Sequence, residues 1–418
     1  MAAANIRFGK PKVAVLGIGY SRISRDPLPE GRIVGDECIE ACRTAIADAG
    51  LTPQDVDGIT SFVEDSSPAV DGVTGVTPQY VWRRLGLDIT WGEVNNKFVG
   101  GSLIEAHNAI AGGACRFALV WRAVDDPRLP ARRAALNGAA AQRPKVSGDM
   151  AFSAPYGPVG GFIQGGHSQT AQRYYHRYGA TREHMANHVV RNRSNALKNE
   201  KSYWAINKPE TLSVDDYMAA RMIADPLCLY DCDIPVRGCI AYVLGPAEAA
   251  QDLDHGAAYV KAFAKAWIGP RGPQAFYHGG GRLLKPALED NNDLPPLFQR
   301  HLWEPAGLQP SDMSTASVYD GFSILTWLWL EALGFCGEGE AFEYVQGGHN
   351  EIGGSLPLNT SGGHLAEGAL AGAPHYAEAA LQCMGRAGVR QVQDCRYALA
   401  ATDRPTRAQV IIFSSEAN

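Results

Sequence analysis

The residues best placed for chemistry lie in the turn Tyr319-Asp-Gly-Phe-Ser323, which precedes a predicted helix through Leu333. Tyr319 and Asp320 are candidate catalytic residues, because a positioned hydroxyl can give or take a proton. A free tyrosine has a pKa of ~10, so acting as a base at pH 7 costs about 4 kcal/mol unless the site lowers that pKa. Tyr319 can therefore work as a base or as a neutral proton donor. A packed aromatic with a hydrogen-bonded hydroxyl is the simpler alternative.

A second candidate region is the glycine-rich loop from Asn359 to Ala373. Its glycines allow backbone conformations and close approaches that other residues do not. Gly363 and His364 in this loop are candidate substrate-binding residues. His375 and Tyr376 follow directly and are candidate catalytic residues for a second proton transfer.

A third region, Val94 to Gly113, has the pattern of a tight turn that leads into a helix. The glycine pair at 100–101 permits close backbone approach, and Ser102 is expected to cap the first turn. Backbone N–H groups at such a turn point toward an anion or a developing oxyanion. Asn96 and Phe98 are the candidate oxyanion and substrate-binding residues of this turn.

These three regions resemble the active-site loops of thiolases, above all the sterol-carrier-protein-x branch. The nucleophilic cysteine of that family matches Phe98, and its facing histidine matches Tyr319. The loop 359–373 matches the family's Asn-x-x-Gly-Gly-x-x-x-x-Gly-His-Pro-x-Gly-Ala motif in its glycines. Its catalytic histidine and its proline are replaced by Ala369 and Leu370. The resemblance spans nearly the whole chain.

Thiolase chemistry needs a thiolate nucleophile, and the family's positions for it are not cysteine here. The C-terminal Cys-x-Gly motif is also replaced, by Ala-Ala-Thr-Asp at 400–403. Cys115, Cys232 and Cys239 fall in or beside apolar strands, so none is expected to substitute. We therefore expect a protein that binds an acyl-CoA but does not form a covalent acyl-enzyme.

The chain is most similar to the cysteine-less acyl-CoA aldolases of bacterial steroid side-chain degradation, through Tyr319 and the run Leu229 to Pro235. The resemblance implies a carbon–carbon lyase that cleaves a β-hydroxyacyl-CoA, such as a steroid-CoA, to a ketone or aldehyde and a short acyl-CoA. A base takes the hydroxyl proton while an oxyanion site holds the thioester enolate. The relatives have a further Tyr or His in the last loop, where this chain has Ala369 and Ala373.

Two other functions remain open at this stage. The chain could be a non-catalytic thiolase-fold protein that binds an acyl-CoA or a lipid. It could also be an acyltransferase with a displaced nucleophile. Turnover of a β-hydroxyacyl-CoA separates the aldolase from the binding protein, and resistance to thiol alkylation separates it from the acyltransferase.

An internal repeat predicts the fold. Ala49-Gly-Leu-Thr-Pro-Gln-Asp55 recurs 257 positions later as Ala306-Gly-Leu-Gln-Pro-Ser-Asp312, each after a predicted helix and before a short strand. The chain is therefore expected to contain two copies of one α/β unit with mostly parallel strands. The resemblance implies the thiolase fold, an α/β fold of two duplicated halves in a five-layer αβαβα arrangement. We place the N-terminal half at 1–250, with an excursion at about 125–225, and the C-terminal half at 257–418.

Composition limits the remaining possibilities. With a net charge of −6 and a pI near 6, the chain is not expected to bind nucleic acid. It has no apolar run near the ~20 residues of a membrane span and no secretory signal pattern, so a cytoplasmic location is expected. Its nine cysteines include no CxxC pair, and no metal site is expected. The basic segment 167–225 is expected to be a solvated helical excursion, with contact to coenzyme A phosphates as the alternative.

The resemblance also implies partners. The protein is expected to form a homodimer, because exposed sheet edges need cover. Its relatives act with a small acyl-CoA-binding protein that has a zinc ribbon and an OB-fold, so a hetero-oligomer is expected. No cofactor is expected apart from the coenzyme A thioester of the substrate.

Overall fold

The computed structural model describes residues 8–62, 71–73, 75–95, 98–125, 161–267 and 294–417. A nine-stranded mixed sheet has the order β3-β2-β4-β7-β1-β8-β11-β10-β9. The bounds of its strands are β1 Val13–Tyr20, β2 Gly58–Phe62, β3 Trp91–Asn95, β4 Ala118–Asp125, β7 Arg237–Pro246, β8 Ala258–Trp267, β9 Thr315–Val318, β10 Tyr397–Thr402 and β11 Arg407–Ser414. A separate two-stranded sheet consists of β5 Met222–Ala224 and β6 Leu227–Cys228.

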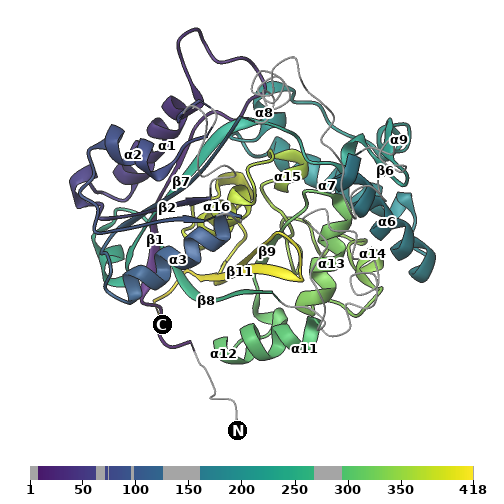
Figure 1. Cartoon of the computed structure of the whole chain (residues 1–418). Helices are drawn as coiled ribbons and strands as arrows, with labels where there is room; N and C mark the ends of the chain where they lie inside the picture. The colour runs from purple at the N-terminus through teal and green to yellow at the C-terminus, as the bar shows by residue number, and fades with distance from the viewer. Residues whose placement is uncertain are drawn as a thin grey trace, which may run out of the picture.

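The helices surround and divide this sheet (Figure 1). Their bounds are α1 Val34–Asp48, α2 Pro78–Leu85, α3 Val99–Ala111, α6 Gly161–Tyr178, α7 Arg182–Leu197, α8 Tyr203–Asn207, α9 Val214–Met218, α11 Leu294–Phe298, α12 Glu304–Ala306, α13 Ser323–Leu333, α14 Ala341–Tyr344, α15 Gly363–Ala366 and α16 Ala373–Cys383.

The sheet divides into two halves that share a four-strand order, β2-β4-β7-β1 in the first half and β9-β10-β11-β8 in the second. One half has the order β3-β2-β4-β7-β1 and the other has β8-β11-β10-β9, so the first strand of each half lies at the junction. In each half, the last strand in sequence, β7 or β11, runs antiparallel to both of its neighbours. β1 and β8 pair only over Ala14↔Tyr259 and Val15↔Ala258. This arrangement confirms the predicted duplication.

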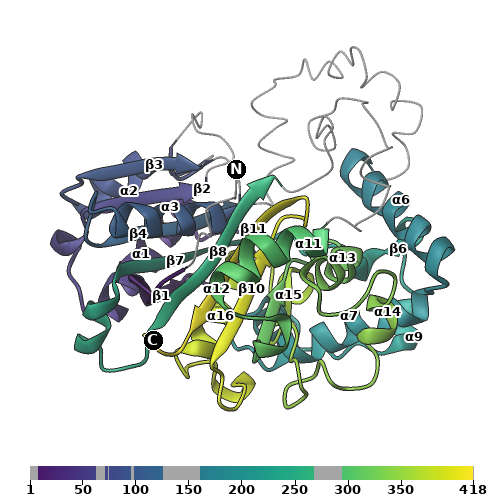
Figure 2. The same cartoon turned by 90° about the horizontal axis from the view of Figure 1, so that it is seen from below.

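Three buried clusters define five layers. α1 and α2 pack on the outer face of the first half-sheet, and α3 and α16 lie between the two half-sheets. The helices α6, α7 and α13 cover the outer face of the second half-sheet. Figure 2 shows the same arrangement from below, with α16 beside the strands of both halves. The predicted αβαβα thiolase fold is confirmed.

The repeated segments adopt the same local structure. Helices α1 and α12 are both followed by a glycine in the left-handed region, Gly50 and Gly307, each with φ of 67°. A 3₁₀ turn comes next, and the aspartate at its end accepts a hydrogen bond from the backbone N–H three residues earlier. The N–O distance is 2.8 Å for Asp55 and 2.7 Å for Asp312. β2 and β9 then begin, so the two strands enter the sheet in the same way.

Two sequence-based expectations are wrong. Ser102 does not cap α3, because the helix begins earlier and Phe98 is its N-cap residue. The segment 167–225 is not a solvated excursion, because one face of α7 is buried against the second half. Arg191 donates to the Val345 carbonyl oxygen, and the guanidinium of Arg193 lies 3.2 Å from the centre of the Trp204 ring. These two arginines are therefore committed to contacts within the protein.

In the part of the chain that the structure describes, no helix is long and apolar enough to cross a membrane. The same residues include no group of three or more His, Cys, Asp or Glu side chains that could hold a metal ion.

Candidate active site

A row of three aromatic rings crosses the junction between the two halves. Phe62 ends β2, Phe98 precedes α3, and Tyr319 follows β9. The rings of Phe62 and Phe98 are stacked with centroids 6.1 Å apart, and the rings of Phe98 and Tyr319 meet edge to face at 5.1 Å. The structure therefore brings the predicted Tyr319 and Phe98 together. Both are half-buried, so a substrate can reach them.

Two histidines lie on the other side of Tyr319. The ring of His364 is 4.7 Å from that of Tyr319, and the ring of His375 is 5.9 Å away. The two imidazoles stack on each other at 5.2 Å, and both side chains are fully buried. His364 comes from α15 and His375 from the first turn of α16. The two helices that flank the loop 367–372 therefore supply two imidazoles to the site.

Asp320 holds these groups in place. Its carboxylate accepts hydrogen bonds from the His364 backbone N–H at 2.7 Å and from the Asn192 side chain at 2.8 Å. His375 Nε2 lies 3.3 Å from the same carboxylate, and its Nδ1 is 3.1 Å from the Ser317 hydroxyl. Asp320 is fully buried. It therefore orients its neighbours and does not itself face the substrate.

Two glycines make this packing feasible. A Cβ atom at Gly363 would lie 2.2 Å from the Asp320 carboxylate, and its φ of +61° also favours glycine. Gly363 therefore admits the carboxylate to the start of α15. A Cβ atom at Gly321 would lie 2.5 Å from the Tyr319 hydroxyl oxygen, which places that hydroxyl directly over Gly321.

The hydrogen bonds of His364 define its protonation. Its Nε2 accepts from the Gly372 backbone N–H at 2.8 Å, so the ring proton must be on Nδ1. Burial lowers the pKa of His364 well below its usual value, and the neighbouring His375 lowers it further. His364 is therefore a neutral imidazole. Its Nδ1–H points toward Asp233, whose carboxylate oxygen is 3.7 Å away.

Asp233 is a site residue that the sequence predictions missed. Its backbone N–H donates to the Gly321 carbonyl oxygen at 3.0 Å, and the next residue, Ile234, accepts from the Ala369 N–H at 3.0 Å. Burial raises the pKa of Asp233 to about 7, and the charge of Asp320 adds to this shift. The run Leu229 to Pro235 contained a signal, because it carries two aspartates beside a proline. Asn192 and Phe62 had no comparable signal.

Three predicted residues are not part of this cluster as described. The hydroxyl of Tyr376 bonds to the Thr402 hydroxyl at 2.7 Å and to the Gln409 carbonyl oxygen at 2.8 Å, between α16 and the sheet. Burial raises the pKa of Tyr376, so it stays protonated. The Gly101 N–H at the predicted anion turn already donates to the Gln409 side chain at 2.7 Å. Asn96 lies outside the described residues.

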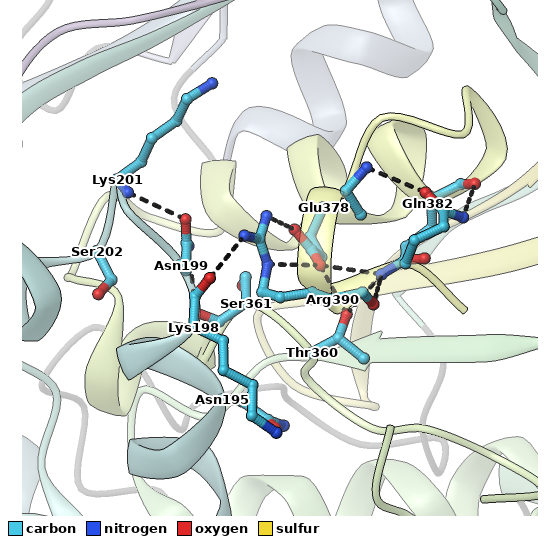
Figure 3. Close-up of polar contacts among 12 residues, drawn as sticks. Asn195, Lys198, Asn199, Lys201, Ser202, Thr360, Ser361, Glu378, Gln382 and Arg390 are labelled. Atoms are coloured by element: carbon cyan, nitrogen blue, oxygen red, sulfur yellow. Dashed lines mark hydrogen bonds and ion pairs between the residues drawn. The ribbon is translucent and has the colours of Figure 1, made fainter. Parts of the chain in front are cut away.

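A buried polar network fixes the loop that carries His364 (Figure 3). Arg390 and Glu378 form an ion pair with an N–O distance of 3.0 Å, and the Thr360 hydroxyl donates to the same carboxylate at 2.7 Å. From the other side, Asn199 donates to the Ser361 carbonyl oxygen at 3.2 Å. A buried ion pair with all these partners favours one loop conformation, because any other leaves charges unpaired.

The described residues offer no activated thiol. Burial raises the pKa of Cys115, Cys228 and Cys232 to about 12 each, so these thiols stay protonated at neutral pH. Of these, Cys232 lies nearest in sequence to the site, but its Sγ is directed to the Cys228 carbonyl oxygen at 3.7 Å. A nucleophilic cysteine needs the opposite shift in pKa.

The fold and this site define a thiolase-fold protein with three aromatic rings at the junction of its two halves. The "Thiolase C-terminal domain-like" family model matches residues 300–413. The chain is 31% identical to the 17-hydroxy-3-oxo-4-pregnene-20-carboxyl-CoA lyase of Mycobacterium tuberculosis, over 96% of this chain and 99% of that protein. It is 32% identical to the steroid side-chain-cleaving aldolase of Thermomonospora curvata, over 95% and 97% of the two chains.

A solved structure described as the Ltp2-ChsH2(DUF35) aldolase superposes with a TM-score of 0.78 at 30% identity, and the match covers 96% of this chain and 97% of that one. The chain therefore belongs to the thiolase superfamily, in the lipid-transfer-protein-like branch of steroid side-chain-cleaving aldolases. The family predicted from the sequence is confirmed.

Proposed function

We propose that this protein is an acyl-CoA retro-aldolase, a carbon–carbon lyase that cleaves the side chain of a β-hydroxyacyl-CoA to a ketone or aldehyde and a short acyl-CoA. The observation that carries the proposal is the contact between Phe98 and Tyr319 at the position of the family's nucleophile. The names of the two relatives supply the substrate class, a steroid side chain held as a coenzyme A thioester.

Retro-aldol cleavage fits the side chains that are present. The reaction removes the proton of the β-hydroxyl, breaks the Cα–Cβ bond and leaves the electron pair on the thioester enolate, which is then protonated at Cα. No step needs an acyl-enzyme, so Phe98 is compatible with it. Tyr319 is the half-buried hydroxyl in the cluster, and we assign it proton transfer at Cα or at the hydroxyl oxygen.

Assembly is part of the proposal. The structure of the similar aldolase is described as a complex with a DUF35 protein, which supports a hetero-oligomer with an acyl-CoA-binding partner of that kind here. A homodimer would cover the edge strand β3, where Val94 is 37% exposed. No cofactor enters this mechanism beyond the coenzyme A of the substrate, and we propose a cytoplasmic location.

The test is cleavage of a steroid β-hydroxyacyl-CoA, with release of the ketone measured with and without iodoacetamide treatment. A DUF35 protein of the kind found in the similar aldolase structure is included. The aldolase is expected to keep its activity after alkylation, because no thiol takes part. Loss of activity on alkylation would favour an acyltransferase, and tight binding without cleavage would favour a non-catalytic acyl-CoA-binding protein.

A further inference from the structure

The retro-aldol reaction needs two proton transfers, and the residue at the family's position for the second one is Ala369. A methyl side chain cannot move a proton. The reaction therefore needs another titratable group that lies beside the Tyr319 turn and that a substrate can reach. Buried groups such as His375 and Tyr376 do not meet the second condition.

Asp233 meets both conditions, because its backbone N–H donates to Gly321 in the Tyr319 turn and its side chain is partly exposed. The segment around it runs along the last loop, because Pro235 pairs with Ala369 in an isolated bridge and Cys232 pairs with Phe322. These bridges hold Asp233 between the Tyr319 turn and the position of the missing side chain. About 29% of the Asp233 side chain is exposed, whereas His364 beside it is 1% exposed.

The buried Nδ1–H of His364 supplies the second observation. Among the described residues it has no hydrogen-bond partner, and its 3.7 Å distance to Asp233 is too long for a hydrogen bond. A buried donor without a partner is costly, so this N–H favours a carboxylate acceptor, and Asp233 is the carboxylate that it faces.

Resting on the function proposed above, we propose that Asp233 is the second acid–base group of the active site and accepts the proton of the substrate β-hydroxyl. The O–H electron pair becomes the second bond of the product carbonyl as the Cα–Cβ bond breaks. The electron pair of that bond passes to the thioester enolate. Tyr319 then gives its proton to Cα and is reprotonated from Asp233 through water, because both side chains are half-exposed.

The charges around Asp233 suit a base that works near neutral pH. Asp320 faces it from the turn after β9, His364 from α15, and Cys232 lies on its own segment. His364 is neutral and the Cys232 thiol is protonated, so only Asp320 adds charge. Burial and Asp320 together raise the pKa of Asp233 to about 7, where a general base is most effective.

The test compares pH profiles of kcat/KM from pH 5 to 9 for the complex with its partner. The carboxylate is the active form, so the wild-type value is expected to fall on the acidic side of about pH 7. Asp233→Asn should lose this acidic limb and about 10²–10⁴-fold in turnover at pH 8. Tyr319→Phe should be slow but keep the limb, because Asp233 is intact.

Glu367→Gln is the matched control. Burial also raises the pKa of Glu367 to about 7, but this carboxyl is fully buried near Arg390 and Lys201 and belongs to no step proposed here. The variant should keep the acidic limb and turnover within threefold. Asp233→Ala with added formate is a second measurement. Formate should raise the turnover of this variant at least tenfold over its turnover without formate.

Suppose that the wild-type enzyme is active and that Asp233→Asn keeps the acidic limb and turnover within threefold. This result would overturn the proposed role of Asp233 and leave the proposed function standing. So would a failure of formate to restore any rate to a folded Asp233→Ala variant. A wild-type complex that cleaves no β-hydroxyacyl-CoA would overturn the proposed function itself.

Discussion

The ends of β2 and β9 are the same position in the two copies of the repeat, and they differ in what they present. Phe62 and Tyr319 are 257 positions apart, the same interval as the rest of the repeat, and both rings contact Phe98. The guanidinium of Arg122 lies 4.3 Å from the centre of the Phe62 ring and donates to the Phe62 carbonyl oxygen. Tyr319 is instead surrounded by Asp320, His364 and His375.

This difference separates what the duplication determines from what it does not. The glycine, the 3₁₀ turn and the aspartate before each strand have the same geometry, so they specify backbone in both halves. The chemistry comes from the side chains that follow Tyr319, from α7, which packs against the second copy, and from α16, which packs between the two half-sheets. A repeat in the sequence therefore locates a candidate site but does not say which copy is active.

A large effect is expected at Asp320, which corresponds in the repeat to Val63 of the first copy. Asp320→Asn puts an amide NH₂ against either the His364 N–H or the Asn192 side chain, because both are donors to the carboxylate. Misplacing the imidazoles beside Tyr319 should lower kcat about 10²-fold with little change in KM. Steady-state kinetics check this. A large rise in KM at unchanged kcat would contradict a positioning role.

A smaller effect is expected at Gly321. In Gly321→Ala the new Cβ would lie 2.5 Å from the Tyr319 hydroxyl oxygen, so the tyrosine must move by a few tenths of an ångström or more. We expect turnover to fall about tenfold, between a full loss of the hydroxyl and no change. Gly238→Ala in β7 is the control, because its Cβ meets its nearest neighbour at an ordinary 3.4 Å. Equal rates for the two variants would contradict the placement of the hydroxyl.

The smallest effects are expected where the two copies are alike. Asp55→Ala and Asp312→Ala each remove a carboxylate that accepts a backbone N–H at the 3₁₀ turn. Each should lower the free energy of unfolding by about 1 kcal/mol and leave turnover unchanged. Chemical denaturation of both variants measures this. A cost in one copy only would show that the turns are not equivalent.

Much of the fold was predictable from the sequence, because the repeat and the glycine loops are local patterns. The duplicated thiolase architecture, the family and the pairing of Phe98 with Tyr319 are confirmed, and the relatives bear out the predicted carbon–carbon lyase. Ser102 was misplaced because helix starts are set by backbone geometry that a single capping residue does not determine. The proposed domain boundaries stay a prediction.

The site was predicted only in part because its contacts are long-range. Asp233 is 131 residues from His364 in sequence, and nothing in the local pattern of either residue indicates the other. The burial of α7 was missed for a similar reason, since its polar residues bond to the loops of the second half. Polar composition indicates solvent exposure only when no other element supplies hydrogen-bond partners.

The most direct test of the account is Tyr319→Phe, which makes the two copies alike at the end of their strands. The ring and its contacts with Phe98 and His364 remain, so acyl-CoA affinity should stay nearly the same and the stability cost should be near 1 kcal/mol. Ketone release from a β-hydroxyacyl-CoA, measured with the partner protein present, should fall by about 10²–10⁴-fold. Cleavage within threefold of the wild-type rate would contradict a chemical role for the Tyr319 hydroxyl.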